Sequence, residues 1–576
     1  MSEDSGYLRL AQEDGRAAGS AAYPEDIRTG YTQPTTRVYG KRSKWILFFS
    51  LGLAAYIYSL DGTTTYTYLA YATSEFGGHS LLGPIQVAQG IIIAVGKPVI
   101  AKVADVGSRG TAYCGVLIFY MLGYSIIATA ENIQAVAAGI VLYAIGYTGL
   151  QLLTQVVIAD ITTLKWRGLV LSLNSFPFLI NAFIGSNISA AIIENAGWRW
   201  GYGMFVILIP IALSPLIGTL LWSERITRRR MGSANAPKKA CIRSILDIAE
   251  ELDVVGLLLI GTSISLMLLP LSLVKHTPRA GNGAAIFAMF LAGIILVPLF
   301  ALWDFRWARY PVIPLRFAVN RSVVGASLIG AFDFMAFYLT FTYLYSFIIV
   351  VKDWTLINSV YFMQTQMVTM TLCGIFTGMY MHKFKRYKML LVSGLIIRLI
   401  GVALMLHSRG ADGSTFELLM TQVLQGIGGG IAALSIQVSA QASVPHVDVA
   451  MVTALVLLVT EFGAAGGGAI AGAIWSSQMP LKLAHHLPFL SQDQRDVLFG
   501  SIAEAGSKPR GDPVREGVIS AYSDVMRIML LVGTVVSVLP ILVAWNMPDW
   551  HLGDGQRTID TTGSADAGGE DEDVDS

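Results

Sequence analysis

Charged residues are scarce in this 576-residue sequence, at 14% of the chain against about 25% in ordinary soluble domains. Cysteine is scarcer, with three residues and no Cys-x-x-Cys spacing, which argues against a disulfide scaffold or a cysteine-ligated metal. The chain also lacks a Gly-x-x-x-x-Gly-Lys-Ser/Thr phosphate loop, so it has no recognisable site for ATP hydrolysis. The formal net charge of +1 gives no basis for nucleic-acid binding.

Hydrophobic residues make up 54% of the chain, and the mean hydropathy is +0.58. They fall in blocks of about 20 residues or more, the length that a helix needs to cross a bilayer. The sequence predicts an all-α integral membrane protein with fourteen spans, at roughly 44–70, 83–104, 112–130, 134–159, 167–192, 200–222, 252–273, 283–304, 322–351, 357–381, 387–407, 415–441, 449–476 and 524–547.

Lysine and arginine gather in most loops after even-numbered spans, and the loops after the first and third spans carry neither. The positive-inside rule then places both termini in the cytosol. Residues 1–43 are polar and lack the layout of a signal peptide. Loop 223–251 is basic and cytosolic, whereas loop 477–523 lies outside and is either functional or a passive tether. The acidic tail 548–576 is predicted to be disordered.

Asp61 is the most informative residue, because a carboxylate inside a span costs about 2.5–3.5 kcal/mol even on lenient insertion scales. Tyr58, Thr65 and Tyr68 share its helix face at 3-4-3 spacing. It lies about 16 residues beyond Trp45, at or past the membrane midplane on the outer side. We therefore expect Asp61 to face a polar cavity and to be the first candidate for proton coupling.

Two more carboxylates, Asp333 and Glu461, lie inside predicted spans and are further candidates for proton coupling. The competing interpretation is a structural ion pair, for which Lys97 in the second span is an available cation.

Aromatic, amide and hydroxyl side chains recur at helical spacing in several spans and suit a large polar solute better than an ion filter. As substrate contacts we predict Tyr58, Thr65, Tyr68, Tyr147, Gln151, Asn174, Phe341, Tyr345 and Gln425. The competing interpretations are interhelical hydrogen bonds for the amides and anchors at the membrane interface for the tyrosines.

Residues 101–110, Ala-Lys-Val-Ala-Asp-Val-Gly-Ser-Arg-Gly, resemble the Gly-x-x-x-Asp-x-x-Gly-Arg-Arg signature of the major facilitator superfamily. Asp105 and Arg109 match, whereas Gly110 replaces the final arginine. Longer strings resemble fungal siderophore–iron transporters, among them Tyr58-Ser59-Leu60-Asp61, Gly96-Lys97-Pro98, Ile158-Ala159-Asp160-Ile161-Thr162, Lys165-Trp166-Arg167-Gly168 and Trp198-Arg199-Trp200-Gly201-Tyr202. This resemblance covers about 44–547.

The resemblance implies the major facilitator fold, in which two six-helix bundles rock against each other for alternating access. It predicts a tail 1–43, a bundle 44–222, a linker 223–251, an extra helix pair 252–304, a loop 305–321, a second bundle 322–547 and a tail 548–576. It also implies a gate at the cytosolic helix ends, with the candidate residues Asp105, Arg109, Asp160 and Arg167.

The function implied is the import of intact ferric hydroxamate siderophores by proton symport, by a monomer in the plasma membrane or in an endosomal or vacuolar membrane. The chelator fills the coordination sphere of the iron, so we expect no protein metal ligands and no cofactor. The expected partners are the ferric siderophore, protons and the lipid bilayer. The alternatives are a glutathione/proton exchanger or drug/toxin exporter of the same superfamily, and a non-transporting nutrient sensor. No nucleophile–base motif suggests an enzyme.

Overall fold

The computed structural model describes residues 41–76, 82–106, 108–162, 164–230, 250, 253–273, 282–352, 354–410, 413–445, 448–500, 502–550 and 552. All regular elements in these ranges are helices. Lipid offers no hydrogen bonds to a backbone, so helices, which pair their own N–H and C=O groups, are the elements expected there. Most of both predicted tails and of the linker 223–251 lies outside the described residues.

The N-terminal bundle makes six passes. Its helices are α3 (Lys41–Glu75), α4 (Leu82–Val106), α5 (Arg109–Ala128), α6 (Ile133–Ile161), α7 (Leu164–Asn174), α8 (Phe176–Asn195) and α9 (Trp198–Arg230). α7 and α8 form one pass that breaks at Ser175, next to Pro177, which lacks a backbone N–H. α3 packs against α8 and α9, and α5 packs against α6 and α9. α9 continues to Arg230, past the predicted end of its span at 222.

The C-terminal bundle repeats this order with two broken passes. Its helices are α14 (Arg321–Phe341), α15 (Leu344–Val351), α16 (Leu356–Phe384), α17 (Lys388–Ser408), α18 (Thr415–Ala442), α19 (Val449–His486), α22 (Pro513–Val536) and α23 (Val538–Trp545). α14 packs along α19, and α18 packs against both α16 and α17. By chain order, α14, α17 and α18 are the counterparts of α3, α5 and α6.

Twelve helices of the described chain are long and apolar enough to cross a membrane. Two further helices fill the remaining positions. α11 (Val254–Leu273) has a shorter apolar stretch, Val254–Leu268, and α16 has the length of a span but carries polar residues such as Gln364 and Gln366. The architecture is therefore the predicted all-α membrane fold, and it is consistent with fourteen passes.

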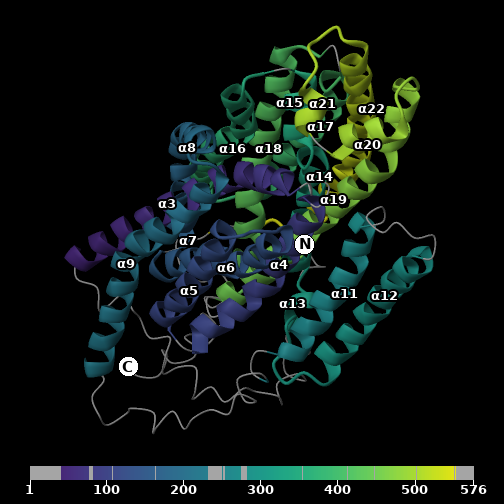
Figure 1. Ribbon diagram of the computed structural model, residues 1–576. Coiled ribbons are helices and arrows are strands. Elements are labelled where there is room, and N and C mark those ends of the chain that lie inside the picture. Colours follow the sequence, from purple (N-terminus) through teal and green to yellow (C-terminus); the bar gives the residue numbers. More distant parts are fainter. Residues whose placement is uncertain are drawn as a thin grey trace, which may run out of the picture.

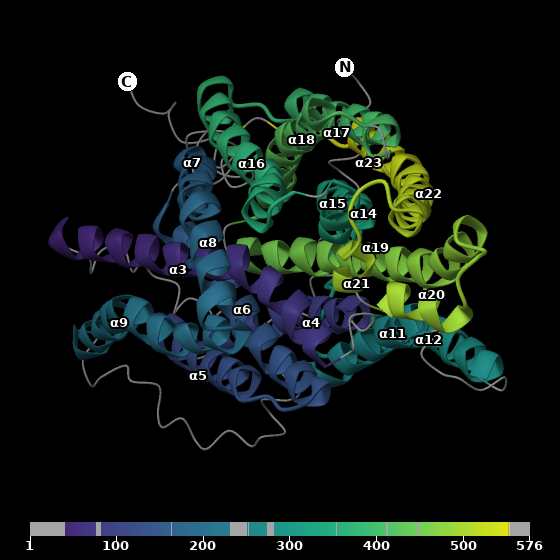
Figure 2. The ribbon, with the colours of Figure 1, turned by 45° about the horizontal axis from the view of Figure 1, so that its top comes forward.

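The two bundles meet along a seam with two lines of contact, α4 against α19 and α7–α8 against α16. In both views the extra helices α11 and α12 (Asn282–Arg306) form a pair at one edge of the molecule (Figures 1 and 2). α11 packs against α4 and α19, so the extra pair covers the first line of the seam. Apolar contacts between Val95 and Gly261, and around Ile264 and Leu268, pack the extra pair onto this side of the seam.

The segment predicted as outer loop 477–523 is largely helical. α19 continues to His486, α20 (Gln492–Gly500) and α21 (Ile502–Gly506) follow, and α22 begins at Pro513. Leu483, Leu487 and Ala505 are buried in the same core as α15 and α22. The segment thus packs onto the C-terminal bundle, as the upper right of Figure 1 shows for α20 to α22.

Candidate functional site

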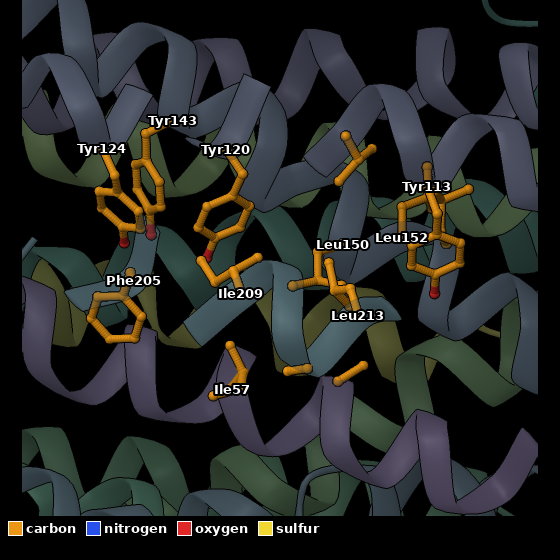
Figure 3. Close-up of a cluster of buried hydrophobic side chains, with 14 of the residues drawn as sticks. Ile57, Tyr113, Tyr120, Tyr124, Tyr143, Leu150, Leu152, Phe205, Ile209 and Leu213 are labelled. Atoms are coloured by element: carbon orange, nitrogen blue, oxygen red, sulfur yellow. The ribbon is translucent and has the colours of Figure 1, made fainter. Parts of the chain in front are cut away.

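Asp61 lies fully buried inside the N-terminal bundle, where three phenol hydroxyls donate to its carboxylate. Tyr120 and Tyr124 of α5 bond its two oxygens, and Tyr143 of α6 donates to Oδ2 at 3.1 Å. Figure 3 shows these three rings with their hydroxyl ends in one space beside α3. The carboxylate is therefore held by neutral donors that come from two neighbouring helices.

No cation accompanies this carboxylate, because the described part of the chain gives Asp61 hydroxyl partners and no ion-pair partner. Hydrogen bonds from hydroxyls offset part of the cost of burying a charge, but they do not neutralise it. A proton can neutralise it without movement of any other charged group. This is the property that a coupling carboxylate needs.

Tyr58 and Tyr147 extend from the phenols around Asp61 towards the seam. Their rings stack with centroids 4.8 Å apart, and Phe178 of α8 contacts Tyr58 edge-on at 5.8 Å. Tyr147 also lies 5.5 Å from Tyr143, its neighbour one turn away on α6. Both Tyr58 and Tyr147 are half-buried, whereas Tyr143 is buried. The structure thus joins two of the predicted substrate contacts in one aromatic pair.

The other predicted substrate contacts are dispersed. Tyr68 is fully buried and packs on Gly201 and Tyr202 of α9, and Thr65 donates to the backbone carbonyl of Asp61 at 2.7 Å. The remaining ones lie elsewhere in the two bundles: Gln151 half-buried on α6, Asn174 at the end of α7, Phe341 stacked on Phe337 at 4.8 Å, and Tyr345 buried on α15 near Tyr71.

Glu461 forms an ion pair across the seam. Its Oε1 lies 2.7 Å from Nζ of Lys97, which is fully buried on α4 while the Glu461 side chain on α19 is 16% exposed. The ion pair that was one interpretation of this carboxylate is therefore present, and it joins the two bundles. Because it bridges two bundles, separating them along this line would break it.

Asp333 is also paired, inside the C-terminal bundle. Nη1 of Arg398 on α17 lies 2.6 Å from its Oδ2, and both side chains are buried. Gln425 of α18 donates to the backbone carbonyl of Arg398 at 2.8 Å, so this predicted substrate contact braces the pair. The amide of Gln425 thus has the interhelical role that was the competing interpretation.

Two of the four predicted gating residues are in contact. Nε of Arg109, at the start of α5, lies 3.2 Å from Oδ2 of Asp160 at the end of α6. Arg109 follows Ser108, which caps α5 together with Thr111 in a reciprocal capping box. The side chains of Asp105 and Arg167 lie outside the described part of the chain.

Four residues of this site, Tyr120, Tyr124, Tyr143 and Arg398, were not among the predicted site residues. Tyr120 and Tyr124 are one turn apart on α5, a spacing that predicts a shared face. Tyr113, two turns before Tyr120, lies on the same side of the helix. Arg398 sits within a strongly apolar span, where an isolated arginine signals a buried partner. Neither signal says which of the distant helices supplies the partner.

A sequence model described as Major Facilitator Superfamily matches residues 47–410. The chain belongs to this superfamily. The MFS siderochrome iron transporter C of Aspergillus fumigatus is 34% identical over 517 residues, covering 89% of this chain and 84% of the relative. The siderophore transporter fer7 of Mycosarcoma maydis is 31% identical and covers 95% and 87%. These relatives place the chain in the fungal siderophore–iron transporter family, and it is a transporter rather than an enzyme.

Solved structures agree on the fold. A POT family peptide transporter superposes with a TM-score of 0.56 at 13% identity, over 88% of this chain and 97% of the other. The proton:xylose symporter XylE superposes with a TM-score of 0.53 at 13% identity, over 90% and 98%. The major facilitator fold predicted for this membrane transporter is thus confirmed.

Proposed function

We propose that this transporter imports intact ferric hydroxamate siderophores by proton symport, working as a monomer in the plasma membrane with both termini in the cytosol. Family membership supports the substrate class, because its relatives in Aspergillus fumigatus and Mycosarcoma maydis are named as siderophore transporters. The observation that carries the coupling is the buried carboxylate of Asp61, which has three hydroxyl donors and no cation among the described residues.

The iron is cargo in this proposal. The hydroxamate oxygens of the chelator surround the ferric ion, so the protein recognises an organic shell with amides, methylenes and hydroxyls. Tyr58 and Tyr147 at the seam offer ring faces for apolar contact and hydroxyls for hydrogen bonds. Gln155 and Gln437, which bond each other across the seam at 3.1 Å, are amides that would exchange partners when the bundles separate.

Asp61 is the primary coupling group. Protonation of Asp333 would leave the Arg398 charge buried without a partner, which is costly, so that pair is assigned a structural role. As a coupling group, Glu461 ranks between Asp61 and Asp333, since it is partly exposed and its partner Lys97 belongs to the other bundle. Loss of its charge would release the seam, which makes it the secondary coupling group.

Alternating access requires contacts on each side of the membrane that open in turn. Near the outer ends of α8 and α16, the Asn187 amide donates to the Tyr361 hydroxyl at 2.9 Å. Towards the cytosolic ends, Trp166 of α7 lies 4.7 Å from His382 of α16, measured between ring centroids. These pairs join the two bundles and are the candidates for the outer and inner gates.

The test is uptake by a fungal strain that lacks its own siderophore transporters. Cells that express the full chain are given radioiron-labelled ferric trihydroxamates, a ferric catecholate and hemin, because a heme transporter of Schizosaccharomyces pombe is also 31% identical. We expect accumulation of the trihydroxamates, faster at external pH 5 than at pH 7.5 and abolished by a protonophore. Accumulation that is independent of pH and protonophore would overturn the symport.

The same strain separates the alternatives. Toxin resistance or glutathione-dependent efflux without accumulation of iron chelate would indicate an exporter or exchanger. An iron-dependent transcriptional response without flux, lost when 1–40 and 552–576 are deleted, would indicate a sensor. Surface labelling of intact cells checks the plasma-membrane location.

A further inference from the structure

We propose that Tyr143, followed by the stacked pair Tyr147 and Tyr58, forms a phenol relay that carries protons between Asp61 and the seam. The inference rests on the proposed proton coupling and adds the route by which the proton reaches a fully buried carboxylate. It assigns Tyr143 the transferring role and leaves Tyr120 and Tyr124 the role of positioning Asp61.

The three tyrosines that donate to Asp61 have different neighbours. Tyr124 is packed between Phe205 and Tyr202 of α9, with ring centroids 5.5 Å away in each case, inside the apolar core. Tyr120 comes from the same helix and is fully buried. Tyr143 differs, because its own helix carries Tyr147 one turn further on, 5.5 Å away between centroids. This branch continues along α6 to the half-buried Tyr147.

The next step of the route lies against α3. A methyl group built on Gly62, the residue after Asp61, would lie 3.6 Å from the Tyr147 hydroxyl and 3.5 Å from Phe178. These are ordinary van der Waals separations, and they place the Tyr147 hydroxyl beside the α3 backbone next to Asp61. Tyr147 stacks on Tyr58, and the two hydroxyls interact with each other.

The far end of the route lies within electrostatic range of the inter-bundle ion pair. The charge of Glu461 acts on the Tyr58 hydroxyl, and Glu461 is bonded to Lys97 at 2.7 Å. The titratable groups that face the path are Tyr120, Tyr124 and Tyr143 around Asp61, with Tyr68 and Tyr202 beside them, then Tyr147 and Tyr58, with Tyr338 of α14 facing Tyr147, and finally Glu461 with Lys97. The relay thus runs from Asp61, which has no cation partner among the described residues, towards Glu461, which bridges the two bundles.

The transfer conserves protons at each phenol. Tyr143 gives its hydroxyl proton to Oδ2 of Asp61 while its Oη accepts a proton from Tyr147. Tyr147 in turn accepts a proton from Tyr58, and Tyr58 accepts one from a hydronium ion at the seam, which leaves as water. At each phenol oxygen one O–H bond forms as another breaks. Each ring ends neutral, and Asp61 changes from carboxylate to carboxylic acid. Release follows the same steps in reverse. No oxidant or cofactor enters the step, because only protons move.

The test uses the full chain in proteoliposomes with an imposed pH gradient and a ferric trihydroxamate as the probe. Tyr143→Phe keeps the ring and removes the hydroxyl. We expect gradient-driven accumulation to slow at least about tenfold, which corresponds to the free energy of one hydrogen bond to a charged group. Exchange of chelate without net proton movement should persist. In Tyr143→Phe, the solvent deuterium isotope effect on uptake should be closer to one than in the wild type, since proton transfer then follows a different route.

Tyr113→Phe is the matched control. Tyr113 is equally buried at the α5–α6 interface, but its hydroxyl bonds Thr154 at 3.1 Å, and Figure 3 shows it apart from the Asp61 group. This variant should transport as the wild type does. Tyr120→Phe and Tyr124→Phe should instead shift the midpoint of the pH profile, because they remove donors to the Asp61 carboxylate without interrupting the route.

Three outcomes overturn the relay: wild-type rate and isotope effect in Tyr143→Phe, an equal slowing in Tyr113→Phe, or the same pH shift in all three phenol variants around Asp61. If Tyr143→Phe does not reach the membrane, Tyr147→Phe at a half-buried position interrupts the same route and must give the slowing. Wild-type uptake that ignores the pH gradient would overturn the proposed symport instead, and so the two failures are distinguishable.

Discussion

The two bundles each bury a carboxylate on their first helix, and they hold it by different chemistry. Asp61 of α3 accepts hydrogen bonds from three phenols on α5 and α6. Asp333 of α14 forms an ion pair of 2.6 Å with Arg398 on α17, the counterpart of α5. In both cases the third helix of the bundle supplies a partner, but only in the C-terminal bundle is that partner charged.

This difference determines which carboxylate can exchange a proton. Adding a proton to Asp333 would leave the buried Arg398 guanidinium without a counter-ion, for which water or another carboxylate would have to compensate. Adding one to Asp61 removes a buried charge and leaves three neutral hydroxyls that still accept a hydrogen bond. The N-terminal bundle is therefore built for a change of protonation, and the C-terminal bundle for permanent pairing.

The largest expected effect comes from removing the proton site. Asp61→Asn keeps the size of the side chain and most of its hydrogen-bonding capacity, but it cannot be protonated and deprotonated. We expect gradient-driven accumulation to fall roughly 100-fold or more, as for other positioned proton-transfer groups, with the protein still folded and in the membrane. Uptake into proteoliposomes measures this. Wild-type accumulation in this variant would break the comparison, since both carboxylates would then be structural.

The next effect concerns stability in the other bundle. Arg398→Met removes the cation and leaves the Asp333 charge buried, which we expect to destabilise the protein by about 3–5 kcal/mol. The double variant Asp333→Leu/Arg398→Met removes both charges and should regain most of that loss. Thermal unfolding of detergent-purified protein compares the two. A double variant as unstable as the single one would show that packing around Arg398, and not its charge, supports the bundle.

The cost of charge in lipid was enough to single out Asp61, Asp333 and Glu461 from the sequence, but not to pair them. Asp333 and Arg398 are 65 residues apart, and helical periodicity does not specify which helices become neighbours. The 3-4-3 spacing likewise puts Tyr68 on the face of Asp61, whereas the structure packs Tyr68 on α9 and turns Asp61 to α5 and α6. One helix face is wide enough to meet two different neighbours, so a shared face is not a shared pocket.

A smaller effect is expected at the seam, where Glu461 pairs with Lys97 from the opposite bundle. Glu461→Gln and Lys97→Met each remove one charge, and we expect the population with the bundles parted along α4 and α19 to rise about tenfold, equivalent to about 1.4 kcal/mol. Thiol labelling of single cysteines on α4 and α19 measures that population. If the charge-swapped variant Lys97→Glu/Glu461→Lys labels as strongly as the single variants, attraction between these charges does not hold the seam.

The smallest effect is expected at the outer end of α3, where Glu75 provides a third arrangement of a carboxylate. It accepts hydrogen bonds from the Trp198 indole and from Nη1 of Arg199 at 2.8 Å, and its side chain is 46% exposed. The Trp198 bond, and then Arg199, hold the pKa of Glu75 below its ordinary value. A lowered pKa means stabilisation that is complete at neutral pH and is lost as the pH falls through the folded pKa, which lies below the ordinary glutamate value.

Because water screens this exposed pair, Glu75→Gln should cost less than about 1 kcal/mol. The deficit in melting temperature relative to the wild type should be present at pH 7 and vanish near pH 3. Arg199→Gln serves as a comparison, because Arg199 also donates to the Ala130 carbonyl at 3.0 Å, and it should lose only the part of its deficit that comes from Glu75 over the same interval. A deficit that persists at pH 3 would assign the role of Glu75 to packing against Trp198. Glu75 combines a neutral N–H donor and a charged donor at a partly exposed position. A small effect here would therefore identify burial, rather than the type of partner alone, as the reason Asp61 and Asp333 matter.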